Sequence, residues 1–156
     1  MKQLLIIFLL GAQLIARAQD TTCSNITRTY DEFEKQTTLQ TPILKNCGLT
    51  KVISEKGATY YLSLNAKGSM PSIGQAGVKV ILSYNQMLSF PTAEIDIAVA
   101  ESGYEYSAFI PLNADQLETL TKFKVLKWRL YVFDQDQSSE DGWRFKDQVN
   151  CLVKMK

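Results

Sequence analysis

The sequence predicts a mainly β domain with two helices, an α+β class. We expect an antiparallel β-sandwich or curled sheet, flanked by a short helix and a C-terminal helix. Three observations lead to this prediction. Apolar and polar residues alternate along several short segments, which is typical of strands with one buried face. Turn-forming residues separate these segments. The regular βαβ alternation that builds a parallel sheet is not apparent, so sequential antiparallel hairpins are expected.

The clearest hairpin joins 93–100 to 104–110 through Glu101-Ser102-Gly103, because the apolar residues of both segments recur with a period of two. Residues 125–133 are partly apolar on both faces and are therefore placed centrally in a sheet. In total we expect about seven or eight strands. The others lie at 45–54, 58–65, 78–83 and 87–90, with one or two less regular strands within 27–42.

Two helices are predicted. Asn113 can cap the first, and Gln116 stands three residues later, where its side chain can reach back in a capping box. Residues 140–154 fit both a helical stripe and a strand. We favour the helix, because Ser138 or Ser139 can cap it and acidic residues follow near its positive end.

The first 18 residues have the order of parts of a secretory signal peptide. A basic start precedes an apolar run at 4–10, and small residues at Ala16 and Ala18 fit an A-x-A cleavage site. The alternative is a buried N-terminal helix. We therefore predict a signal peptide at 1–18, a flexible segment at 19–26 and a single β-rich domain at 27–156. The protein is expected to be exported, periplasmic or secreted, with no transmembrane segment in the mature chain.

Charge and composition exclude several functions. The chain has 17 Lys and Arg against 16 Asp and Glu, so no basic footprint for nucleic acid is expected. The absence of histidine excludes Ser-His-Asp and Cys-His catalysis. Neither a phosphate-binding glycine motif nor a C-x-x-C pair is present. We therefore expect no cofactor, no metal and no catalytic residues of these classes.

Export permits a disulfide among Cys23, Cys47 and Cys151. We prefer the pair Cys47–Cys151, because both residues lie in segments that look ordered, whereas Cys23 lies just after the leader. Three free thiols are the alternative.

Aromatic residues on the less apolar strand faces form a candidate binding surface, since aromatic platforms bind sugars and proteins. These residues are Tyr61, Phe109, Tyr131 and Phe133. The alternative is that a helix or a second sheet covers them.

Acidic residues suggest two further sites. Glu94 and Asp96 are predicted on one face of one strand, next to Glu105 on its partner, where a carboxylate-dependent hydrolase could use them. Asp134-x-Asp136-x-Ser138 is similar to the start of a calcium loop, but Ser139 and Phe145 occupy the positions that need Gly and Glu. Solvated charges on a strand or loop are the simpler interpretation of both.

Over residues 28–153 the chain resembles a group of small exported bacterial proteins with no known activity. The segments that carry the resemblance are Tyr30-Asp31-Glu32-Phe33, Thr41-Pro42-Ile43, Tyr60-Tyr61-Leu62-Ser63-Leu64, Ala108-Phe109-Ile110-Pro111-Leu112, Arg129-Leu130-Tyr131 and Phe145-Lys146-Asp147. The resemblance implies a periplasmic or secreted location and lends no site residues.

The leading hypothesis is a non-enzymatic binding or envelope-associated module, whose partner is an extracytoplasmic protein, a glycan or a second copy. A carboxylate-dependent hydrolase is the first alternative. The second is a small periplasmic inhibitor or immunity-type protein that acts through the loop 67–77.

Overall fold

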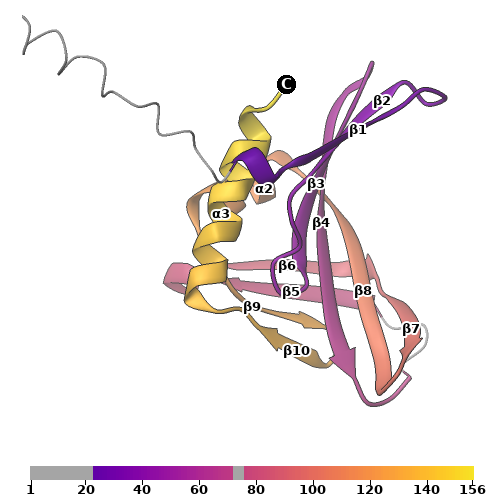
Figure 1. Cartoon of the computed structure of the whole chain (residues 1–156). Helices are drawn as coiled ribbons and strands as arrows, with labels where there is room; N and C mark the ends of the chain where they lie inside the picture. The colour runs from indigo at the N-terminus through magenta and orange to yellow at the C-terminus, as the bar shows by residue number, and fades with distance from the viewer. Residues whose placement is uncertain (1–22, 72–75) are drawn as a thin grey trace, which may run out of the picture.

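The computed structural model describes residues 23–71 and 76–156, which fold into two antiparallel sheets flanked by helices, with 55% of the chain in strands (Figure 1). This confirms the predicted fold class. One sheet has six strands in the order β1-β2-β3-β4-β8-β7, and the other has four in the order β10-β9-β5-β6. The strands are β1 (Thr27–Asp31), β2 (Gln36–Gln40), β3 (Cys47–Ser54), β4 (Gly57–Gly68), β5 (Ala76–Leu82), β6 (Met87–Glu94), β7 (Asp96–Ala100), β8 (Gly103–Leu112), β9 (Val125–Leu130) and β10 (Phe133–Asp136).

Both predicted helices are present, as α2 (Ala114–Lys122) and α3 (Ser139–Lys154). The capping box at the start of α2 forms as expected: Asn113 Oδ1 accepts from the Gln116 N–H, and Gln116 Oε1 accepts from the Asn113 N–H, both at 2.9 Å. Ser138 caps α3, with its Oγ accepting from the Asp141 N–H at 3.1 Å. Two short 3-10 helices, η1 (Cys23–Asn25) and η2 (Ser83–Asn85), complete the described elements.

The core lies where the inner faces of the two sheets meet, and α3 packs against both β9 of the smaller sheet and β3 of the larger one (Figure 1). Alternation along β4 and β8 places Leu62 and Tyr106 inside. The indole of Trp128 is fully buried, and its Nε1 donates to the Asn65 carbonyl at 2.9 Å, which joins the two sheets. A satisfied indole N–H removes the cost of burying that polar group.

A buried lysine closes the end of α3. Lys51 lies on β3 and is 5% exposed. Its Nζ donates to the carbonyls of Leu152 and Met155, at 3.4 and 2.5 Å. The last turn of a helix leaves carbonyls without intrahelical partners, and a cation there also suits the helix dipole. Lys51 therefore fixes α3 against the six-stranded sheet.

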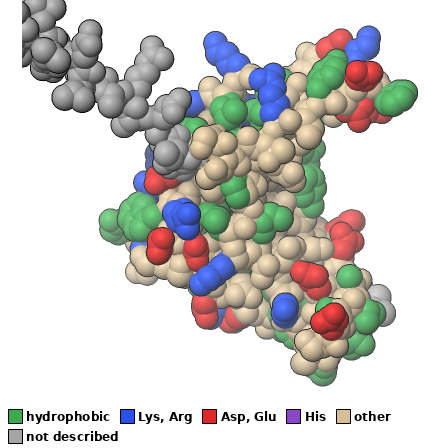
Figure 2. Space-filling model, in the orientation of Figure 1, with side chains coloured by type: hydrophobic (Ala, Val, Ile, Leu, Met, Phe, Trp, Pro, Cys, Tyr) green, Lys and Arg blue, Asp and Glu red, His purple; other side chains and the backbone are tan. Residues whose placement is uncertain are grey.

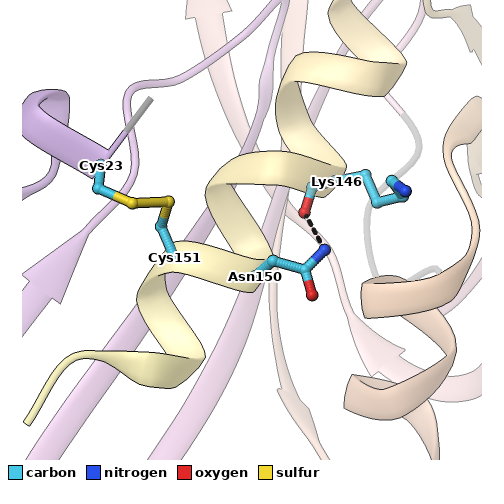
Figure 3. Close-up of a disulfide and its surroundings, with 4 residues drawn as sticks. All are labelled: Cys23, Lys146, Asn150 and Cys151. Atoms are coloured by element: carbon cyan, nitrogen blue, oxygen red, sulfur yellow. Dashed lines mark hydrogen bonds between the residues drawn. A yellow bond between two sulfur atoms is a disulfide. The ribbon is translucent and has the colours of Figure 1, made fainter. Parts of the chain in front are cut away.

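The disulfide joins Cys23 to Cys151, so the predicted pair Cys47–Cys151 is wrong (Figure 3). The Cα atoms of Cys23 and Cys151 are 5.4 Å apart, within the range that a disulfide spans. Cys47 is instead a buried free thiol on β3, where it packs in the core. The bond ties η1 to α3, so Cys23 is held in place although it lies in the segment predicted to be flexible. The predicted signal peptide at 1–18 and residues 19–22 lie outside the described residues.

Two segments predicted as single strands are interrupted. The chain passes from the smaller sheet to the larger one at Ile95, so Glu94 ends β6 and Asp96 begins β7. The predicted strand at 125–133 is also two strands, because Tyr131 adopts a positive φ of 56° and turns the chain between β9 and β10. The expected central position of β9 is confirmed, since it pairs with both β5 and β10.

Charged side chains of both signs are scattered over the face of the molecule drawn in Figure 2. Within 23–71 and 76–156, the structure has no helix with the length and apolar character needed to cross a membrane.

Candidate functional site

A groove of about 440 Å³ runs between β6 and β8, at the place where the chain passes between the two sheets. This volume falls within the range of small-ligand sites, roughly 300–1,000 Å³. Its lining residues come from β6, β8 and the first turn of α2, and they are Ser89, Phe90, Pro91, Thr92, Ala93, Glu94, Phe109, Ile110, Pro111 and Gln116. Segments from both sheets therefore build the groove.

The backbone beside the groove is open on both sides. β6 is the last strand of its sheet, and β7 pairs with β8 only as far as Ser107. Open strand edges attract other strands, and proline blocks such pairing because it has no N–H. Each edge carries one proline at the groove, Pro91 on β6 and Pro111 on β8. The groove is thus protected against strand addition.

An exposed aromatic residue, Phe109, lines the groove and stacks on a second aromatic ring outside the lining. Phe109 is 55% exposed and stacks on Tyr61 of the neighbouring strand, with ring centroids 4.5 Å apart and planes 9° apart. The pairing Ser63↔Phe109 and Tyr61↔Pro111 sets both rings on the outer face of the six-stranded sheet. Stacking restricts the Phe109 ring, so the ring is presented to a ligand with little conformational freedom left to lose.

Polar groups complete the lining. Gln116 lines the groove, and the capping box of α2 holds its side chain through Oε1. Ser89 and Thr92 add hydroxyl groups, and Glu94 adds a carboxylate. The lining contains no Lys or Arg, so its only formal charge is negative. Such a groove suits a neutral ligand that has both an apolar face and hydroxyl groups.

Of the four predicted aromatic residues, the structure brings together only Tyr61 and Phe109. Phe133 faces inward and packs on Tyr106, with ring centroids 4.5 Å apart, so its assignment to a binding surface is wrong. Tyr131 lies in the turn after β9 and lines an adjacent hollow, which shares Ser89 and Pro91 with the groove. The prediction failed for Phe133 because it continued the strand through the turn at Tyr131, which changes the face on which the next residues lie.

The predicted carboxylate group does not assemble in the groove. Glu94 lines it, whereas Asp96 and Glu105 lie on β7 and β8 outside the lining. The expectation that Glu94 and Asp96 share one strand face is wrong, because the strand breaks between them. Retaining glycosidases need two carboxyl groups about 5 Å apart, and inverting enzymes need them further apart across the same bond.

The acidic residues of the calcium-like segment are engaged elsewhere. Arg129 binds Asp134 through both Nε and Nη2, and Lys127 Nζ lies 3.1 Å from the same carboxylate. Hydrogen bonding from Arg129 lowers the pKa of Asp134 well below its ordinary value. Lys127 also pairs with Asp136 at 3.5 Å. Both acids therefore form part of a charge network on the outer face of the smaller sheet.

Pro91, Gln116 and the β6 side of the groove were not predicted as site residues from the sequence. Pro91 in β6 and Pro111 in β8 could have indicated that these strands have unpaired edges, because proline within a sheet is largely confined to edge strands. A comparison of the chain with protein-family models, with curated proteins and with solved structures found no match.

Proposed function

We propose that the chain is an exported, non-catalytic module that binds a neutral glycan in the groove between β6 and β8. The observation that carries this proposal is the exposed Phe109 ring, held by Tyr61 at the wall of a groove lined with hydroxyl, amide and carboxylate groups. A sugar ring has an apolar face that stacks on an aromatic side chain and hydroxyl groups that exchange hydrogen bonds with such polar groups.

The prolines favour a glycan over an extended peptide. A peptide that joins an open sheet edge gains affinity from a continuous ladder of main-chain hydrogen bonds. Pro91 and Pro111 interrupt the donors of both edges at the groove, so such a ladder would be incomplete. A glycan needs no ladder, because it binds through ring stacking and side-chain hydrogen bonds.

Export is part of the proposal and rests on two observations. The first 18 residues have the pattern of a signal peptide. The Cys23–Cys151 pair lies at disulfide distance, and such bonds persist in oxidising compartments. The proposed location is the periplasm or the extracellular space.

The proposal is tested by binding to neutral oligosaccharides, such as cello-, chito-, xylo- and manno-oligosaccharides, presented on an array and then titrated in solution. We expect the wild-type chain to bind at least one of these series. Phe109→Ala should weaken binding by about tenfold or more, because it removes the stacking surface. Val99→Ala is the matched control, since Val99 is an exposed apolar residue of the same sheet outside the groove lining.

Two results would overturn the proposal. One is the absence of binding to every neutral series by a chain whose circular dichroism shows it to be folded. The other is binding that Phe109→Ala and Val99→Ala leave equally strong, because the ligand would then contact another surface.

A further inference from the structure

The hairpin formed by β1 and β2 projects from the body of the protein (Figure 1), and its connecting turn carries an exposed apolar residue, Phe33. All five residues of β1 are exposed, and Phe33 in the connecting turn is 97% exposed. Asp31 Oδ1 accepts from the N–H groups of Phe33 and Glu34, at 2.8 and 3.0 Å, so the turn has a defined shape. The turn therefore holds the phenyl ring of Phe33 in an exposed position, with little conformational freedom to lose on binding.

Acidic residues surround this ring. Residues 31–35 contain three carboxylates, from Asp31, Glu32 and Glu34, against the single amine of Lys35. Apolar and acidic side chains gather at the end of the hairpin in Figure 2. A surface that receives this tip should therefore combine a small apolar hollow with a basic rim.

The outer face of the smaller sheet carries such a surface. Ile81 pairs with Met87 on one side and with Lys127 on the other, which sets an apolar spot beside a basic one. A hollow of about 110 Å³ lies there, lined by Lys79, Ile81, Met87, Lys127, Trp128, Arg129 and Asp134. This volume is on the scale of cavities that admit benzene, roughly 150 Å³. We call it the Ile81–Met87 hollow.

The rim has a charge of the required sign. Three basic residues line the hollow against one acid, Asp134. Lys127 and Arg129 already pair with that acid, whereas Lys79 forms no salt bridge within the part of the chain that the structure describes. The Ile81 and Met87 side chains are 43% and 59% exposed, so the hollow is open to solvent in a single chain.

We propose that the turn 31–35 of one chain docks in the Ile81–Met87 hollow of a second copy. Phe33 fills the hollow, and Glu32 or Glu34 pairs with Lys79. The charges of the two surfaces are opposite, and the hollow has the size of the ring that it receives. This interaction is independent of the proposed glycan groove, whose lining shares no residue with either surface.

One turn in one hollow is a head-to-tail contact. It builds rings or open filaments when it repeats along a series of chains, and it closes a two-fold dimer when the same two chains exchange turns. The contact area is small, so we expect weak association that becomes visible only as the protein concentration rises.

Sedimentation velocity of the full exported chain, from about 1 µM to about 1 mM, measures this association. We expect the mean mass to rise with concentration for the wild type. Phe33→Ala and Met87→Glu should each weaken association by about tenfold or more. Both substitutions alter exposed side chains, so the fold is retained. Val99→Ala, which changes an exposed apolar residue in neither surface, should associate as the wild type does.

Mixing the two deficient variants tests whether the turn of one chain meets the hollow of another. Phe33→Ala retains the hollow and Met87→Glu retains the turn, so the mixture should form a one-to-one dimer more strongly than either variant associates alone. The single variant Lys79→Glu should lose association. A triple variant that adds Glu32→Lys and Glu34→Lys to Lys79→Glu exchanges the charges of the two surfaces and should regain association. A wild type that stays monomeric throughout, or association unaffected by Phe33→Ala, would overturn the proposal.

Discussion

At the scale of single residues, the fold depends on polar groups that are buried together with their partners. Lys51 is the clearest case, because its ammonium group is almost wholly enclosed and donates to the last carbonyls of α3. Its position on β3 aligns it with Leu39 and Tyr60 on the neighbouring strands. The residue thus joins a strand to a helix end about a hundred residues later in the chain.

Replacing Lys51 tests this role. Lys51→Met keeps the apolar stem and removes the donor, so the carbonyls at the end of α3 lose their partner. We expect a loss of about 1–3 kcal/mol in the free energy of unfolding, measured by urea denaturation. Lys56→Met in the exposed turn after β3 is the control. Equal midpoints for the two variants would show that the Lys51 contacts contribute nothing.

Asp134 predicts an acid-sensitive contribution to stability. Hydrogen bonding from Arg129 lowers its pKa in the folded state. A lowered pKa gives stability that is fully present above the ordinary carboxyl value, near pH 4, and that declines as the pH falls below it. Urea unfolding between pH 7 and pH 2 should therefore show a steeper loss of stability in the wild type than in Asp134→Asn. Parallel curves for the two proteins would contradict this assignment.

Cys47 is expected to be chemically inert. It is buried in the core, and burial raises the pKa of its thiol, which suppresses the reactive thiolate. The folded chain should therefore take up no alkylating reagent without reduction, and one equivalent after unfolding in denaturant. Intact mass before and after unfolding measures this. Two or more equivalents on the folded chain would mean that the Cys23–Cys151 bond is absent.

At the scale of elements, α3 is held by side-chain contacts at its start, near its end and along its length. Its start is capped by Ser138, its end is closed by Lys51, and Cys151 ties it to η1. Asn150 Nδ2 also donates to the Thr121 carbonyl at 3.1 Å, which links α3 to α2. The position of α3 over the larger sheet is therefore set by contacts along its whole length.

The disulfide should stabilise the fold mainly by restricting the unfolded chain. Its two cysteines are 128 residues apart, so the loop that it closes is long. We expect Cys151→Ser to lower the free energy of unfolding by about 2–5 kcal/mol. Cys47→Ala, which leaves the bond intact, measures the separate cost of altering a core residue. Identical stability of Cys151→Ser and the wild type under non-reducing conditions would contradict this expectation.

Local sequence patterns predicted most helices and strands, and they failed where contacts between distant parts of the chain determine the structure. The capping pattern at Asn113 and the acidic start of α3 are read within a few residues, and both helices formed there. The breaks at Ile95 and Tyr131 were missed, because alternation continues across a change of sheet and a tight turn. The disulfide pairing was predicted wrongly because the spacing of the cysteines in the sequence does not indicate that η1 lies beside α3.

At the scale of the whole molecule, the candidate site is a product of topology. The groove exists because the chain leaves the smaller sheet after β6 and re-enters the larger one at β7, which is too short to cover the whole of β8. Tyr61 and Phe109 were identifiable from the sequence as outward aromatic residues. The position of Phe109 beside Gln116 and the β6 edge was not, since it depends on how two sheets and a helix are placed together.

The central claim is that this groove is the ligand site, and an amide NMR titration tests it most directly. Isotope-labelled chain would be titrated with cello- and chito-oligosaccharides while the backbone signals are followed. The account predicts progressive shifts confined to residues 89–94, 109–111 and Gln116, with the prolines silent because they have no N–H. Shifts centred on Tyr131 or on the turn at Phe33, or no shifts with any neutral oligosaccharide, would contradict it.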